Sequence, residues 1–253
     1  RKKVGSKFRR LLIGTEGETD TGKTEWALSA PGPGVVVCLD RGFDALYDNP
    51  RPPKTRRDHF GFVVITAPTA TQSTKPFYLE HFIKFRTSFY AALDNVDCRT
   101  VVIDGDSDSW ELQRLAEHGK LTGVYPATKY TDVYAARRGI INRAWDAGKI
   151  VIATNRVGDE YKTLFNADGY PVLDPVTKEE KREKTGRLER KGFPDQQYLW
   201  QIQLRHLYNQ DKGIWGARIL KCKVDPQMVG YVLWGSDCCF RGLVEAVYPH
   251  VDP

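Results

Sequence analysis

The chain has 253 residues, of which 41% are hydrophobic, so it is long enough to bury a sizeable core in one or two domains. It shows no run of roughly 18 consecutive apolar residues and no apolar leader near its start, which disfavours a membrane-spanning helix and a secretory signal. The formal net charge is +6, which makes acidic binding partners plausible. The five cysteines have neither disulfide-framework nor zinc-site spacing, so we expect a protein of the reducing cytoplasm.

Short apolar runs alternate with longer helix-like segments through the first part of the chain. The runs are continuous, as in parallel strands that helices cover on both faces. The predicted strands are Phe8–Ile13, Val35–Leu39, Phe62–Thr66, Thr100–Ile103 and Ile150–Thr154. The predicted helices are Lys23–Leu28, Tyr78–Leu93 and Thr131–Ala147. This order predicts an α/β fold with a mostly parallel central sheet flanked by helices.

The C-terminal part has a different pattern. Gln197–Tyr208 and Ile214–Val224 are strand-like and flank the turn sequence NQDKG, and Tyr231–Trp234 is a third short run. These segments predict an antiparallel β-hairpin at the edge of the sheet. We expect a single domain over residues 1–253, with its core at about residues 8–235.

A phosphate-binding motif follows the first predicted strand. Gly17, Gly22, Lys23 and Thr24 fit the pattern G-x-x-x-x-G-K-[ST]. In such a loop, backbone N–H groups hold the phosphates, the lysine reaches the β- and γ-phosphates, and the hydroxyl ligates Mg²⁺. The expected cofactors are ATP and Mg²⁺. The expected nucleotide-binding residues are Gly17, Glu18, Thr19, Asp20, Thr21, Gly22, Lys23, Thr24 and Glu25.

A carboxylate ends another predicted strand. Asp104 follows the apolar run Thr100–Ile103, which is the form of a Walker B motif that binds Mg²⁺ directly or through water. An apolar strand that ends in Asp is a weak signal by itself. Together with the phosphate loop, it predicts that Thr24 and Asp104 are the metal ligands.

The order of these motifs resembles that of the RecA family. The family has a strand that ends in Lys-x-Lys, and this strand is similar to ILKCKVDPQMVGYVLWG here. The family's preceding strand is similar to QQYLWQIQLRHLY. The strand that leads into the family's second DNA-binding loop is similar to IVIATNRV. Phage-encoded single-strand annealing proteins of the Sak4 type are similar in size. The resemblance implies a RecA-like ATPase core that binds single-stranded DNA and forms a filament or ring.

The resemblance also implies roles for individual residues. Lys221 and Lys223 match paired lysines that reach the γ-phosphate bound by a neighbouring subunit, although ordinary solvent-facing lysines remain the alternative. Asn155 matches a polar sensor of the γ-phosphate, and Arg156 stands where the family usually has Gln. Residues 156–196 correspond to a basic DNA-binding loop without regular structure. Its candidate DNA contacts are Arg156, Lys178, Lys181, Arg182, Lys184, Arg187, Arg190 and Lys191.

The family's catalytic base has no direct counterpart. Members often carry Glu two residues after the Asp that ends the second strand, where this chain reads Asp40, Arg41 and Gly42. Asp106 is the nearest substitute, ahead of Asp40 and Asp44, so we expect Asp106 to orient the attacking water and hydrolysis to be slow.

The sequence therefore predicts a DNA-stimulated ATPase that acts on single-stranded DNA in phage-type recombination or annealing. A phage single-strand-binding or replication protein is a further expected partner. Two alternatives stay open: a motor or loader ATPase driven by a phage replication or packaging protein, and a small-molecule kinase. The expected catalytic residues are Lys23, Asp104, Asp106, Asn155, Lys221 and Lys223.

Overall fold

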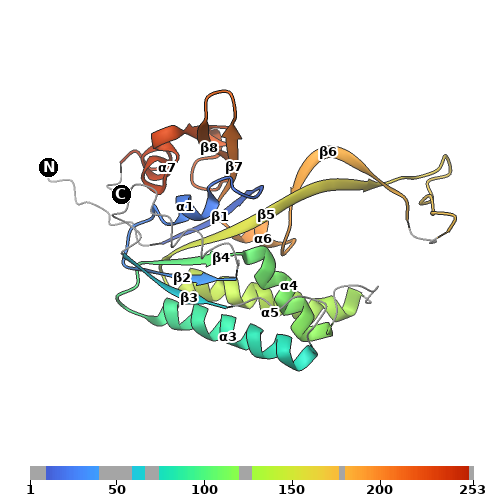
Figure 1. Ribbon diagram of the computed structural model, residues 1–253, viewed down its shortest axis with the longest axis horizontal. Helices are drawn as coiled ribbons and strands as arrows, with labels where there is room; N and C mark the ends of the chain where they lie inside the picture. Colours follow the sequence, from blue (N-terminus) through green and yellow to red (C-terminus); the bar gives the residue numbers. More distant parts are fainter. Residues whose placement is uncertain (1–9, 40–58, 66–73, 120–126, 177–179, 251–253) are drawn as a thin grey trace.

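The computed structural model describes residues 10–39, 59–65, 74–119, 127–176 and 180–250. Within these ranges a nine-stranded sheet lies between two layers of helices (Figure 1). The strand order is β3-β2-β4-β5-β1-β7-β8-β9, and β6 pairs with β5 outside this path. The predicted α/β fold with a central sheet is confirmed.

Parallel pairing holds the centre of the sheet together. β1 (Leu11–Gly17), β2 (Gly34–Cys38), β3 (Phe60–Val64), β4 (Thr100–Asp104) and the start of β5 (Ile150–Thr163) are parallel neighbours, and β7 (Ile202–Asn209) joins β1 in parallel. β8 (Ile214–Cys222) and β9 (Val232–Trp234) are antiparallel, as the sequence predicts for this edge. Because these six strands, β1 to β5 and β7, are parallel, their carboxyl ends meet at one edge of the sheet, where ligands bind in open α/β folds.

Helices cover both faces of the sheet (Figure 1). One layer contains α3 (Lys75–Asp94), α4 (Asp106–His118) and α5 (Ala127–Asp146), and the other contains α1 (Lys23–Ala27) and α7 (Phe240–Val247). A single turn of helix, α6 (Gln196–Leu199), precedes β7, and the 3₁₀ turns η2 (Pro226–Met228) and η3 (Gly235–Asp237) flank β9. None of the helices in the described ranges combines the length and apolar character needed to cross a membrane.

The hydrophobic core is divided by the sheet into two clusters. Along β1, Leu11 and Ile13 pack with Trp26 of α1 and with Leu243 of α7, whereas Leu12 packs with the α3 layer. Successive side chains of a strand point to opposite faces, so the apolar first part of this strand serves both clusters. Burial of such a side chain stabilises the fold by roughly 1.5–3 kcal/mol, which anchors the strand that leads into the phosphate loop.

The segment predicted as an irregular loop forms a two-stranded antiparallel ribbon instead. β5 continues beyond Asn155 to Thr163 and pairs with β6 (Arg182–Arg190), with a register shift between Asp159 and Tyr161. The ribbon projects from the body of the protein (Figure 1). Both of its faces meet solvent, so the sequence lacks the apolar alternation that marks a strand with one buried face.

A second correction concerns the segment predicted as the strand Gln197–Tyr208. Its beginning belongs to α6, and β7 starts only at Ile202. Asp195 caps this one-turn helix, which is too short to produce a helical period in the sequence. The predictions that involve residues 1–9, Asp40 to Asp44, Thr66 and Lys178 lie outside the described residues.

Candidate nucleotide site and the ribbon beside it

The phosphate-binding motif lies between β1 and α1, as predicted. Gly22, the residue that caps α1, has a φ of +79°, a left-handed conformation that strongly favours glycine. At Gly17, a Cβ atom would lie 2.5 Å from Thr21 Oγ1 and 3.1 Å from His206 Cβ. The two glycines of the motif are therefore required by the tight curl of the loop and by its close packing on β7.

Lys23 folds back over the beginning of this loop. Its Nζ donates hydrogen bonds to the carbonyl oxygens of Gly17, at 3.0 Å, and Glu18, at 2.5 Å. Thr21 Oγ1 donates to the same Glu18 carbonyl at 2.8 Å. The ammonium group of Lys23 is thus held by backbone oxygens of the motif to which it belongs.

Thr24 and Asp104 are brought together although 80 residues separate them in the chain. Thr24 Oγ1 donates to Asp104 Oδ1 at 2.9 Å, and Thr154 Oγ1 donates to the same oxygen at 2.7 Å. Asp104 is buried at the carboxyl end of β4. A hydroxyl and a carboxylate are the hard oxygen donors that Mg²⁺ takes in phosphate-binding proteins, so this pair fits the predicted metal. Elsewhere in the described ranges, His, Cys, Asp and Glu do not gather in threes that could hold a metal ion.

Two buried polar atoms lie where β1 and β5 run side by side. Asn155 Nδ2 donates weakly to the Thr15 carbonyl at 3.4 Å, but Asn155 Oδ1 and Thr15 Oγ1 have no hydrogen-bond partner among the described residues. Buried polar atoms are almost always paired in folded proteins. These two atoms, at the strand ends beside the phosphate loop, are therefore suited to a polar ligand or a water molecule.

Asp106 is placed differently from its predicted role. It begins α4, and its buried carboxylate forms an ion pair with Arg137 of α5 and accepts hydrogen bonds from Ser109 and Gln196. Both carboxylate oxygens are thus taken by donors of the protein. The turn at Gly105, with a φ of +88°, directs Asp106 into the helix layer rather than along the line of β4. These contacts favour a structural role over that of a catalytic base.

Lys221 and Lys223 both turn toward α6. Lys221 Nζ donates to the Gln197 carbonyl, and Lys223 Nζ donates to the Tyr198 carbonyl at 2.7 Å. Burial, together with the neighbouring Lys223 charge, lowers the pKa of Lys221. Within one chain the pair therefore stabilises the carbonyl end of a short helix, and its action on a neighbouring subunit stays a prediction.

A buried ion pair that the sequence analysis did not identify lies directly before the phosphate loop. Glu16 of β1 accepts a hydrogen bond from Arg205 Nε of β7 at 2.9 Å, and Arg190 Nε of β6 lies 3.9 Å from the other carboxylate oxygen. Arg190 also donates to Gln196, which in turn donates to Asp106. A chain of polar contacts thus joins the strand of the phosphate loop, the ribbon and α4.

His206 lies beneath the loop and was not singled out by the sequence. Its ring is buried and meets the ring of Trp26 edge-on, with 5.8 Å between centroids. Burial, reinforced by the positive charge of Lys23, lowers the pKa of His206 to about 3. This histidine is therefore neutral at physiological pH and forms part of the floor of the loop.

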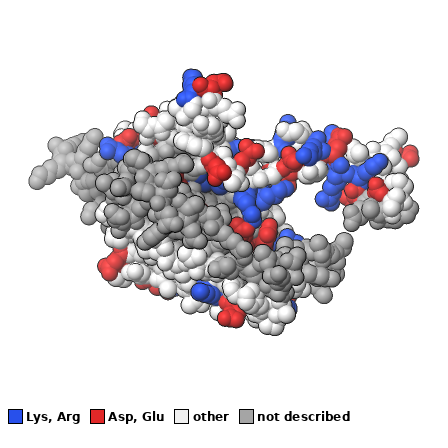
Figure 2. Space-filling model, in the orientation of Figure 1, with Lys and Arg blue, Asp and Glu red and all other residues white. Residues whose placement is uncertain are grey.

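Most of the candidate DNA-binding residues that the structure describes belong to the ribbon, but it is not a basic surface overall. Residues 157–195 contain eight Lys and Arg against nine Asp and Glu. Figure 2 shows the two kinds of side chain interleaved along the ribbon. The candidates that form ion pairs are Arg156 with Asp108, Arg182 with Glu180, Lys184 with Asp159, Arg190 with Glu16 and Lys191 with Glu189. Lys181 and Arg187 are exposed.

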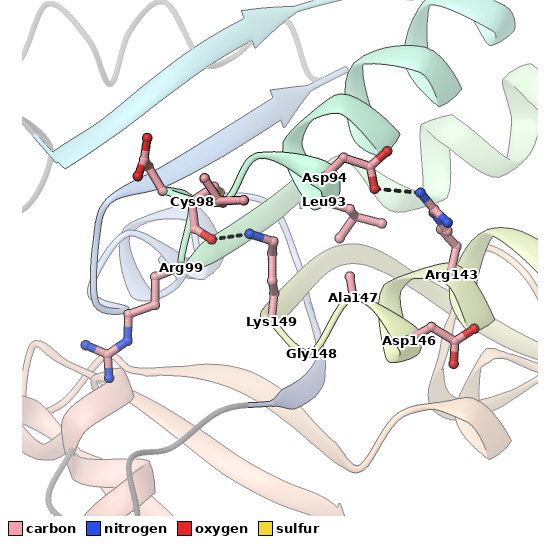
Figure 3. A pocket seen from close by; sticks show the side chains of 11 residues that line it. Leu93, Asp94, Cys98, Arg99, Arg143, Asp146, Ala147, Gly148 and Lys149 are labelled. Atoms are coloured by element: carbon pink, nitrogen blue, oxygen red, sulfur yellow. Dashed lines mark hydrogen bonds and ion pairs between the residues drawn. The ribbon is translucent and has the colours of Figure 1, made fainter.

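A pocket of about 670 Å³ lies at the opposite edge of the sheet, at the amino ends of β4 and β5 (Figure 3). Arg143 pairs with Asp94 at its rim, and Lys149 donates to the carbonyl oxygen of Cys98. Its acidic and basic side chains are equally represented, and Lys149 is engaged by backbone oxygens. The phosphate loop lies at the other ends of the strands, so this pocket is separate from the candidate nucleotide site.

Comparison with known proteins finds a distant likeness to a solved structure. No family model and no curated protein matches the chain. The crystal structure of the RadB recombinase is similar, with a TM-score of 0.46 and 14% sequence identity over 88% of this chain and 86% of that chain. This likeness is too distant to transfer the roles of individual residues.

Proposed function

We propose that this protein binds ATP together with Mg²⁺ and hydrolyses it. The observation that carries the proposal is the 2.9 Å contact between Thr24 and Asp104 beside a glycine-containing loop that precedes a helix. Thr24 and Asp104 would hold Mg²⁺, which neutralises charge on the β- and γ-phosphates during phosphoryl transfer.

Lys23 would recognise the phosphates in this proposal. Its ammonium group exchanges the carbonyl oxygens of Gly17 and Glu18 for phosphate oxygens, which carry more negative charge and so bind it more strongly. The N–H groups at the start of α1 complete the phosphate site. Binding therefore straightens the side chain of Lys23 away from the beginning of the loop.

Asn155 would act as the polar group that accepts a hydrogen bond from the attacking water through Oδ1, or donates to the γ-phosphate through Nδ2. Its Oδ1 atom is buried without a partner among the described residues, and that atom accepts a hydrogen bond. The nearby carboxylates of Glu16 and Asp106 are held in ion pairs. We expect slow hydrolysis, because neither carboxylate is available as a strong general base.

The experiment that tests the proposal compares ATP binding and phosphate release for the wild type, Lys23→Ala and Lys84→Ala, with Mg²⁺ and with EDTA. Lys84 is an exposed residue of α3 and serves as the matched control. We expect Mg²⁺-dependent binding in the wild type and in Lys84→Ala, and its loss in Lys23→Ala. Equal binding by all three proteins would overturn the assignment.

We further propose that single-stranded DNA is the partner of this ATPase, in recombination or annealing. The support is the motif order of the sequence and the projecting ribbon, on which Lys181 and Arg187 are exposed. Phosphate contacts by such residues bind without regard to sequence and weaken with salt.

Anisotropy of a labelled oligothymidylate at low and at high salt tests this part. We expect salt-sensitive binding that the double change Lys181→Ala/Arg187→Ala weakens, whereas Lys84→Ala/Arg86→Ala on α3 leaves it unchanged. Absence of binding by the wild type would overturn the DNA proposal and favour an ATPase driven by a protein partner, while leaving ATP hydrolysis unaffected.

A further inference from the structure

Two aromatic rings lie in contact, tilted against each other, at the end of the β7–β8 hairpin. Tyr208 and Trp215 are partners in the antiparallel register, and their ring centroids lie 4.2 Å apart with 37° between the planes. Both remain open to solvent, with 45% of Tyr208 and 37% of Trp215 exposed. A large aromatic pair that stays accessible in this way is a surface suited to a flat apolar partner.

This pair lies against the phosphate loop. A Cβ atom on Gly22 would lie 4.0 Å from Cδ2 and Cε3 of Trp215, which is van der Waals contact. Gly22 is the residue that caps α1, directly before Lys23. The indole ring therefore borders the site where phosphates are expected to bind.

The position of the metal pair gives the direction in which a nucleotide would lie. Thr24 meets Asp104 of β4, and β4 and β5 lie on one side of β1, whereas β7 and β8 lie on the other. Mg²⁺ held by Thr24 and Asp104 would neutralise charge on the β- and γ-phosphates, so the phosphate end of the nucleotide would lie toward β4 and β5. The nucleoside end then extends toward β7 and β8, where Trp215 is exposed.

We propose that Trp215, backed by Tyr208, is the stacking platform for the base of the bound nucleoside triphosphate. The inference rests on the proposed ATP binding and adds the residues that hold the base. Stacking recognises a flat heteroaromatic ring and not its hydrogen-bonding edge, so the platform accepts both purines and binds them more tightly than pyrimidines.

Calorimetry with ATP and with inorganic tripolyphosphate, both with Mg²⁺, separates the base from the phosphates. In the wild type we expect ATP to bind on the order of 10-fold more tightly than tripolyphosphate, the size of effect seen for one stacked base. Trp215→Ala should remove this difference by weakening ATP alone, and Trp215→Phe should keep most of it. Tyr231→Ala, a change at another exposed aromatic residue, is the matched control.

The outcomes distinguish this inference from the function on which it rests. If the wild type binds ATP and tripolyphosphate with equal affinity, the proposed stacking on Trp215 is wrong. It is also wrong if Trp215→Ala weakens the binding of both ligands equally. If the wild type binds neither ligand, the proposed ATP binding itself is wrong. Lys23→Ala should lose both ligands, since it removes a phosphate contact.

Discussion

Arg205 and Glu16 face each other across the adjacent parallel strands β7 and β1, with Arg205 Nε 2.9 Å from a Glu16 carboxylate oxygen. The same guanidinium donates to the Leu188 carbonyl of β6 at 3.2 Å. Glu16 directly precedes Gly17, the first glycine of the phosphate motif. One side chain thus fixes the start of the loop relative to both the hairpin and the ribbon.

Arg205→Met should destabilise the protein by about 3 kcal/mol, because it leaves the buried Glu16 carboxylate with Arg190 at 3.9 Å as its remaining cationic partner. Urea denaturation measures the loss. Adding Glu16→Gln to Arg205→Met should restore part of the stability, since the buried charge is then gone. Arg218→Met, at an exposed position of β8, is the control, and an equal loss in that variant would contradict the prediction.

Asp106→Asn should reduce stability by about 3 kcal/mol and leave the rate of ATP hydrolysis per folded molecule within a few-fold of the wild type. The reason is that the change leaves the buried Arg137 guanidinium without its ionised partner. Thermal unfolding, and the hydrolysis rate measured well below the transition, check the two parts. If hydrolysis instead slows by roughly 100-fold or more while stability is unchanged, Asp106 is the catalytic base after all.

Stability should fall on acidification through the titration of His206. Its pKa is about 3 in the folded protein and near 6.5 when unfolded, so between these values the unfolded state binds the additional proton. The stabilisation is complete above pH 6.5 and is lost toward pH 3, by up to about 1.4 kcal/mol per pH unit. The free energy of unfolding, measured by chemical denaturation from neutral to mildly acidic pH, should change less with pH in His206→Phe than in the wild type. His81→Gln, on α3, should keep the wild-type pH dependence.

Mixing two inactive variants tests whether Lys221 and Lys223 act on a neighbouring subunit. Lys23→Ala lacks the phosphate-binding lysine, and Lys221→Ala/Lys223→Ala lacks the proposed trans contacts. In this arrangement one chain supplies the loop and its neighbour supplies the paired lysines. In an equal mixture that assembles at random, about a quarter of the sites combine an intact loop with intact lysines, so about a quarter of the wild-type ATPase rate should return. No recovery, with both variants folded, would confine these lysines to their contacts with α6.

The Cys238 thiol should resist alkylation in the native protein. Burial, with the neighbouring Cys239 adding to the effect, raises the pKa of Cys238 to about 12, so that roughly one molecule in 10⁴ is thiolate at pH 8. Iodoacetamide labelling followed by peptide mass spectrometry should show little modification in buffer and rapid modification in urea. Comparable labelling in both conditions would contradict the raised pKa.

The sequence predicts the phosphate loop well because all of its requirements are local. Gly22, Lys23 and Thr24 are consecutive, and the strand before them begins with the apolar run Leu11–Ile13. Asp104 was predictable for a similar reason, since it ends an equally apolar strand. The contact between Thr24 and Asp104 then follows from the topology of a parallel sheet.

Other parts of the site depend on which residues meet across the fold. Glu16 and Arg205 are paired by the register of β1 and β7, which no local pattern reveals. Asp106 was expected to orient the attacking water because it lies two residues after Asp104, but the turn at Gly105 directs it to Arg137. The ribbon was missed because its charged residues pair across two solvent-facing strands, with no buried face to produce an apolar alternation.

The continuous strand β5 connects the ribbon directly to the central sheet. This single 14-residue strand runs from Ile150, inside the parallel sheet, to Thr163, on the projecting ribbon, and spans about 45 Å at roughly 3.3 Å per residue. Asn155 lies where β5 leaves the central sheet, beside the phosphate loop. A tilt of about 5° at Asn155 would displace the outer end of the strand by about 2 Å, so a small change beside the phosphate loop would be larger at the far end of the ribbon.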